Sequence, residues 1–193
     1  MKHIMKLIFG SLITIFFSAS AFAVTVSWTD WTSSDSFSAN GDLLVGSTTV
    51  GVGYSATGAH SFVTTGAGTN FWTGAAYTNG TVDNAPPASD IIALNVGGTV
   101  TVTFAQTVVD PYIGLVSWNG NTVDFGVPIE IDSFGSGFWG SGTPILNGSG
   151  TGFFGSGEVH GVIRLPGSYD SITFTHIGVI GFCSTPPERK CLV

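Results

Sequence analysis

Hydrophobic and polar residues alternate one by one in several short segments of the chain. In residues 99–104, Val100, Val102 and Phe104 alternate with three threonines. The same pattern recurs in residues 24–28, 123–131, 159–165 and 171–175. Alternation places the apolar side chains on one face of an extended strand and the polar ones on the other. We therefore predict five strands that each have a buried face and a solvated face.

Further strands are expected where short apolar runs lie between turn signals. These runs are residues 43–54, 61–64, 91–96, 112–118 and 178–182. Asn-Gly pairs, which favour tight hairpins, begin at Asn40, Asn79, Asn119 and Asn147. No segment after residue 23 has a convincing helical period, although one short helix in a loop is compatible with the pattern. The sequence predicts a single all-β domain with an antiparallel β-sandwich or jelly-roll fold.

A near-repeat of seven residues stands out within this pattern. Residues 136–142 read SGFWGSG, and residues 151–157 read TGFFGSG. We expect them to be the arms of one hairpin that turns near Asn147. Because adjacent side chains in a strand point to opposite faces, one of Phe138 and Trp139 should be buried. The same holds for Phe153 and Phe154.

The N-terminus has the pattern of a secretory signal peptide. Lys2 and Lys6 precede the apolar run 7–17, and residues 21–23 form an Ala-x-Ala site, which predicts cleavage between Ala23 and Val24. The run is shorter than the roughly 20 apolar residues that span a bilayer. We therefore expect a secreted, extracytoplasmic protein with no transmembrane segment in its mature chain. Its expected divisions are a signal peptide (1–23), a β-sandwich domain (24–182) and a C-terminal tail (183–193).

The mature chain is glycine-rich and acidic. Glycine accounts for 28 of the 193 residues, and glycine disfavours helix interiors. Removal of the signal peptide leaves three Lys and Arg against twelve Asp and Glu, which gives a net charge of −9. Nucleic acids and anionic lipids need a basic surface, so both are excluded as partners. Cys183 and Cys191 lie close together near the C-terminus, where the sequence is equally compatible with a disulfide and with two free thiols.

The sequence contains only weak candidates for catalytic or metal-binding residues. No catalytic serine elbow, zinc-binding helix or phosphate loop is present, and His60, His160 and His176 have the spacing of structural residues. Asp124, Glu130 and Asp132 share the polar face of the alternating segment 123–131. We interpret them as a solvated acidic face, with a Ca²⁺ site and a catalytic acid pair as alternatives. No other cofactor is expected.

The tryptophans raise the alternative of a carbohydrate site. Trp31, Trp72 and Trp139 lie in or beside loops rich in glycine and threonine, where exposed rings could stack on sugars. The competing interpretation is that each belongs to the core of the sandwich.

Several strand segments carry a family resemblance. They are VSWTDWT (26–32), TTVGVGYS (48–55), VTVTF (100–104), PYIGL (111–115), SGFWG (136–140), GVIRL (161–165) and SYDSITFT (168–175). In this order they resemble the ectodomains of PEP-CTERM proteins, which are exported by bacteria that make exopolysaccharide and end in a sorting helix. Residues 182–193 contain Pro186-Pro187-Glu188 and two basic residues but no apolar helix. We therefore expect either that the sorting helix was lost or that the protein is released.

This resemblance implies a non-catalytic domain of the cell surface or extracellular matrix. One alternative is a lectin-like carbohydrate-binding module, with or without Ca²⁺, and a second is a secreted hydrolase. The expected partners are extracellular polysaccharide or a second copy of the chain, since threonine-rich strand edges can support self-association.

Overall fold

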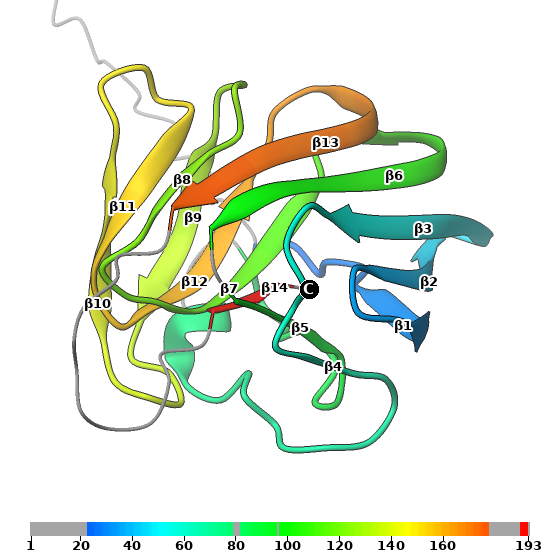
Figure 1. Cartoon of the computed structure of the whole chain (residues 1–193), viewed down its shortest axis with the longest axis horizontal. Helices are drawn as coiled ribbons and strands as arrows, with labels where there is room; N and C mark the ends of the chain where they lie inside the picture. Colours follow the sequence, from blue (N-terminus) through cyan, green and yellow to red (C-terminus); the bar gives the residue numbers. More distant parts are fainter. Residues whose placement is uncertain (1–22, 79–81, 96, 178–189, 193) are drawn as a thin grey trace, which may run out of the picture.

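The computed structural model describes residues 23–78, 82–95, 97–177 and 190–192. Its strands form two antiparallel sheets packed face to face around an apolar core, which confirms the predicted all-β sandwich (Figure 1). One short 3₁₀ turn, η1 (Ala75–Tyr77), lies in a loop. The strands are β1 (Thr29–Ser34), β2 (Ser38–Val45), β3 (Thr48–Ala56), β4 (Phe62–Thr64), β5 (Ile91–Leu94), β6 (Gly98–Val109), β7 (Tyr112–Trp118), β8 (Thr122–Asp124), β9 (Glu130–Gly135), β10 (Gly142–Leu146), β11 (Gly152–Gly157), β12 (Val159–Arg164), β13 (Ser168–Ile177) and β14 (Lys190–Leu192).

The larger sheet has eight strands in the order β1-β2-β3-β6-β13-β8-β11-β10. Its two longest strands, β6 and β13, are paired at the centre, where Val100 lies opposite Phe174 and Thr101 lies opposite Thr173. The apolar pair faces the core, and the threonine pair faces solvent. The predicted alternation in residues 99–104 and 171–175 is therefore confirmed.

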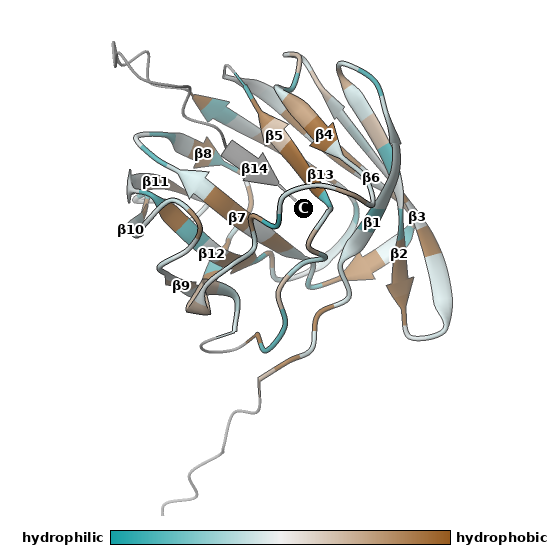
Figure 2. Ribbon diagram, turned by 90° about the horizontal axis from the view of Figure 1, so that it is seen from below, coloured by the Kyte–Doolittle hydropathy of each residue, from teal (hydrophilic) through white to brown (hydrophobic). Residues whose placement is uncertain are grey.

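The smaller sheet has the order β4-β5-β14-β7-β12-β9, and its strands β5, β7 and β12 are buried on both faces. In β5, Ile92 and Leu94 enter the core between the sheets, whereas Ile91 and Ala93 enter a second apolar cluster on the opposite face. That second cluster is completed by Trp72 and other residues of the long connection between β4 and β5. Figure 2 shows the hydrophobic residues that run along β5.

Gly114 in β7 sets how closely this connection approaches the sheet. A Cβ atom at this position would lie 2.9 Å from Cζ3 of Trp72 and 3.1 Å from Cγ of Pro86. The absence of a side chain at Gly114 therefore lets the Trp72 indole lie directly on the strand.

Two strand predictions were too long. Residues 43–54 divide into β2 and β3, which turn at Gly46 with a φ of +62°. Residues 123–131 divide into β8 and β9, which belong to different sheets. Gly126 has a φ of +66°, and Pro128 has no backbone N–H to donate, so the strand cannot continue there.

Residues 24–28 do not form the predicted regular strand. Val24 makes an isolated parallel bridge with Val82. The backbone N–H of Val26 donates to Oδ1 of Asn84 at 2.7 Å, and its carbonyl accepts from Nδ2 of Asn84 at 2.8 Å. One side-chain amide thus takes the place of a neighbouring strand.

The predicted hairpin exists, but its first arm is β10 rather than residues 136–142. β10 pairs with β11 around a turn in which Asn147 Oδ1 accepts the Thr151 N–H. Phe153 is fully buried and Phe154 is exposed, as predicted, whereas Phe138 and Trp139 are both exposed. Phe138 and Trp139 do not point to opposite faces of a strand, because Gly137 and Gly140 close a separate tight turn around them.

The predictions for the two ends of the chain fall largely outside the described residues. This is true of the expected signal peptide up to residue 22, of the strand at 178–182 and of Cys183, so the disulfide stays a prediction. Residues 190–192, which the sequence assigned to the tail, form β14 between β5 and β7. Among the described residues, no helix has the length and apolar character needed to cross a membrane.

We expect Gly114→Ala to destabilise the fold by about 1–3 kcal/mol, because the new methyl group would overpack the Trp72 contact. Urea denaturation followed by circular dichroism measures the free energy of unfolding. Gly148→Ala is the matched control, since no atom lies within 4 Å of the Cβ position there. Equal stability of the two variants would contradict the close packing of Trp72 on β7.

Candidate functional site

The three acids singled out from the sequence are not brought together. Asp124 lies in β8 of the larger sheet, where its Oδ1 accepts the backbone N–H of Gly126 at 2.8 Å. Glu130 and Asp132 lie in β9, the edge strand of the smaller sheet. The common polar face expected for residues 123–131 is therefore wrong, because the chain crosses between the sheets at Gly126 and Pro128.

The side chain of Arg164 lies against the two acids of β9. The Arg164 guanidinium donates to Glu130, and its Nη1 lies 3.4 Å from Oδ2 of Asp110. Its Nε lies 3.9 Å from Oδ2 of Asp132. Burial raises the pKa of Asp132, and the charge of Arg164 opposes that rise. Within the described residues, no group of three or more His, Cys, Asp or Glu side chains could hold a metal ion.

The histidines lie in packed surroundings. The alternation in residues 159–165 predicts that His160 lies on the solvated face of its strand. The residue is instead fully buried, because the β4–β5 connection covers that side of the sheet. The Tyr77 hydroxyl lies 3.3 Å from Nδ1 of His160 and donates to the carbonyl of Leu115 at 2.9 Å. His176 is also buried, beside the Trp118 ring. His60 is half-buried against the Tyr54 ring.

Of the three candidate tryptophans, only Trp139 reaches the surface. Trp31 and Trp72 are each 3% exposed and belong to the two core clusters, so the surface exposure that a stacking contact needs is absent at both. The Trp72 indole N–H donates to the carbonyl of Asp90 at 3.0 Å. Trp139 is 41% exposed.

Trp139 belongs to a surface group that also contains Phe71 and Phe138, here called the aromatic cluster. The Phe71 and Trp139 rings are stacked, with centroids 5.0 Å apart and planes at 18°. Phe138 meets both rings edge-on, at 5.1 Å from Phe71 and 4.8 Å from Trp139. Half-buried Phe62 lies behind Phe71, with ring centroids 6.1 Å apart.

Glycines bring the two parts of the aromatic cluster together. Gly137 and Gly140 hold Phe138 and Trp139 in a tight turn between β9 and β10. Phe71 comes from the β4–β5 connection, which approaches this turn at Gly74. A Cβ at Gly74 would lie 2.3 Å from the Ser136 carbonyl oxygen, so a larger residue could not occupy this position without displacing the backbone.

Polar groups border the aromatic cluster. Asn70 and Ser141 are exposed and adjoin Phe71 and Gly140 in the chain. Glu158 lies behind the turn, with its Cγ 3.7 Å from the Cβ position of Gly140. Its carboxylate accepts from the Ser117 hydroxyl and, at 2.7 Å, from Nδ2 of Asn119. The site thus combines exposed apolar rings with nearby hydrogen-bonding groups.

Sequence reasoning missed Phe71 and misplaced Phe138. The available signal was a pair of adjacent aromatics, Phe71-Trp72, in a glycine-rich segment. When Trp72 enters the second core cluster, the neighbouring Phe71 lies at its edge, half-buried. The contact between Phe71 and the residues near 138 depends on a tertiary approach that no local pattern encodes.

No family model, curated protein or solved structure matches this chain.

We expect calcium to leave the melting temperature of the wild-type protein unchanged, because the Arg164 guanidinium already lies among Asp110, Glu130 and Asp132. Arg164→Gln removes the guanidinium, so millimolar calcium should raise the melting temperature of that variant. Differential scanning calorimetry with calcium or chelator makes the comparison, and Arg164→Lys, which keeps the positive charge, is the control. Stabilisation of the wild type by calcium would show that a site exists without this substitution.

The buried His160 should make the fold less stable in mild acid. Burial lowers the pKa of His160, although Glu158 opposes this effect. An unfolded chain takes up the proton near pH 6.5. The stability contributed by neutral His160 is therefore present above that pH and is lost as the pH falls through the lower, folded pKa.

Melting temperatures measured between pH 7.5 and 5.5 test this expectation. His160→Gln should show a smaller loss of stability with acid than the wild type, and His60→Gln is the matched control. An unchanged pH slope in His160→Gln would assign the acid sensitivity to another group.

Proposed function

We propose that this chain is a non-catalytic domain of the extracellular layer that adheres to neutral polysaccharide through the aromatic cluster. The observation that carries the proposal is the exposure of Trp139 and Phe138, at 41% and 42%, on a turn held in place by ring contacts. This proposal unites the expectation of a surface or matrix protein with that of a carbohydrate-binding module.

The physical basis is the apolar character of both surfaces. Sugar rings have C–H faces that water solvates poorly, and an aromatic ring laid against such a face removes apolar area from water on both sides. Phe71, Phe138 and Trp139 already restrict one another, so binding costs little additional side-chain entropy. Ser141 and the amide group of Asn70, whose Oδ1 accepts the Trp72 backbone N–H at 2.9 Å, are exposed near the rings in the chain and would add hydrogen bonds to sugar hydroxyls.

The charge of the protein favours a neutral polymer. A mature net charge of −9 repels polyanionic polysaccharides at long range. Within the described residues, Arg164 is the cation beside the acids of β9, and it is held by carboxylates. A neutral chain needs no such cation.

Two further points support a binding role over a hydrolytic one. Of the three acids considered for a catalytic pair, Glu130 and Asp132 face Arg164, whereas Asp124 lies in the other sheet. Glu158 is engaged by Ser117 and Asn119. The expected export signal and the resemblance to PEP-CTERM ectodomains both favour a location outside the cell, where such a polymer would be met.

Retention on insoluble neutral polysaccharides tests the proposal. Cellulose, chitin and a β-1,3-glucan are incubated with the protein, and the bound fraction is measured as a function of protein concentration. We expect binding to at least one polymer, with Trp139→Ala and Phe138→Ala each weakening it at least about tenfold, equivalent to 1.4 kcal/mol.

Phe154→Ala is the matched control, because Phe154 has the same 42% exposure as Phe138 but lies on the outer face of the larger sheet. Its affinity should stay within about twofold of the wild type, a change of under 0.5 kcal/mol. Failure of all three polymers to retain the protein would overturn the proposal. An equal loss from Phe154→Ala would move the adhesive surface to Phe154 and its neighbour Ile145.

A further inference from the structure

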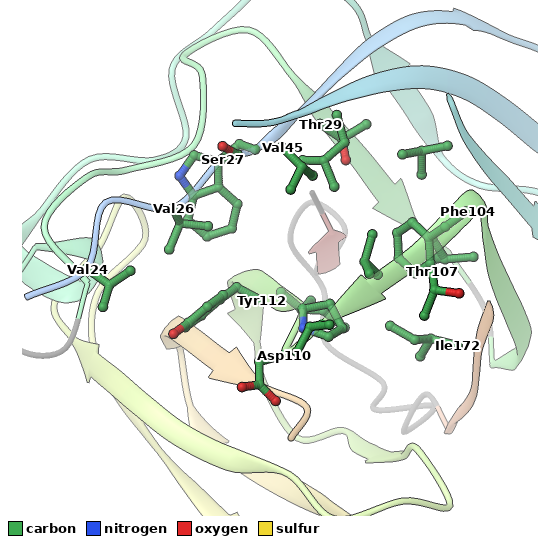
Figure 3. A pocket seen from close by; sticks show the side chains of 18 of the residues that line it. Val24, Val26, Ser27, Thr29, Val45, Phe104, Thr107, Asp110, Tyr112 and Ile172 are labelled. Atoms are coloured by element: carbon green, nitrogen blue, oxygen red, sulfur yellow. The ribbon is translucent and has the colours of Figure 1, made fainter. Parts of the chain in front are cut away.

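A cavity of about 380 Å³ opens between the two sheets at the end that carries β2, the β3–β6 pair and the start of β7. Its walls are mostly apolar and come from both sheets and from the N-terminal segment 24–29. Figure 3 shows Val24, Val26 and Tyr112 on one side of it, and Phe104, Thr107 and Ile172 on the other. The volume lies at the lower end of the range of about 300–1,000 Å³ found for small-molecule pockets.

The cavity exists because the larger sheet extends beyond the part of its inner face that the smaller sheet covers. Leu43, Val102 and Phe104 point to the core side of their strands and line the cavity, yet all three remain half-buried. Side chains of this kind are normally covered in a finished core. The N-terminal segment, held at Val26 by Asn84, closes one side of the space.

One buried donor in the wall has no partner. Trp31 lines the cavity, and only 3% of its surface is exposed. Its indole N–H has no hydrogen-bond partner among the described residues. Buried donors are almost always paired, so an acceptor oxygen on a bound molecule would satisfy this group.

The rim of the cavity disfavours an anion. Asp110 lies on it, and Thr107 on the rim donates its hydroxyl hydrogen to the carboxylate of Asp170. Burial, with the nearby charge of Asp132 as the next cause, raises the pKa of Tyr112. The phenol at the rim is therefore neutral and can donate a hydrogen bond to a ligand.

We propose that this cavity binds a small uncharged amphiphile, with an apolar chain between the sheets and an acceptor oxygen on the Trp31 indole N–H. A medium-chain alcohol represents this chemistry. The cavity shares no residue with the aromatic cluster, so the proposal stands independently of adhesion to polysaccharide.

Fluorescence of N-phenyl-1-naphthylamine, a neutral apolar probe, tests occupancy of the cavity in the protein recovered from expression of the full chain. The probe should brighten on binding, and 1-decanol should displace it. Decanoate, which has the same chain length and a negative charge, should compete at least about tenfold less well, a difference of 1.4 kcal/mol.

Two neighbouring leucines provide a matched pair of variants. Leu43→Phe adds volume inside the cavity, whereas Leu44→Phe makes the same change on the exposed face of β2. Leu43→Phe should weaken probe binding at least about tenfold, and Leu44→Phe should leave it within about twofold. Circular dichroism verifies that both variants are folded.

Trp31→Phe tests the hydrogen bond, because it keeps an aromatic ring and removes the N–H. It should weaken competition by 1-decanol more than it weakens binding of the probe itself. Absence of probe binding, or equal losses in Leu43→Phe and Leu44→Phe, would overturn the cavity as a binding site. Equal competition by decanoate and 1-decanol would overturn the neutral ligand, and unchanged competition in Trp31→Phe would overturn the role of the indole.

Discussion

Burial of the smaller sheet on both faces is the constraint on which the rest of the structure depends. Strands β5, β7 and β12 are buried at consecutive positions, and their apolar side chains lie on both faces, so both faces must leave water. The larger sheet covers one face. The other is covered by the β4–β5 connection, whose Trp72 and Tyr77 form the second core cluster. A long loop thereby acts as a third layer.

The same constraint explains which parts of the fold the sequence could predict. Strands with one solvated face, such as β6 and β13, alternate clearly and were predicted well. β12 was placed correctly, but His160 was assigned to solvent because alternation does not reveal a covering loop. The strand proposed for residues 123–131 also failed for a specific reason. Val123, Phe125 and Ile129 all face the interior, so the alternation continues while the chain passes between sheets.

Prediction of the candidate site was weaker for a related reason. Exposure of a tryptophan depends on what covers it, and that is decided by tertiary contacts. Trp31 and Trp72 occur in or beside loops rich in glycine or threonine like Trp139, yet only Trp139 is exposed. The surroundings of the acids were equally hard to predict, since no spacing in the sequence indicated that Arg164 would lie between Glu130 and Asp110. Local pattern therefore identified candidate residue types but could not group them.

The two proposed binding surfaces arise where the layered packing ends. At the turn between β9 and β10, the third layer reaches its limit and Phe71 meets Phe138 and Trp139, which leaves rings that are ordered but uncovered. At the cavity between the sheets, the larger sheet extends beyond the smaller one. Inward-facing side chains such as Leu43 and Phe104 therefore line a cavity instead of a closed core. Apolar groups left partly exposed on an ordered framework can bind a ligand at a low entropic cost, because the framework is already fixed by folding. The layered packing that stabilises the sandwich thus also determines where apolar surface remains for binding.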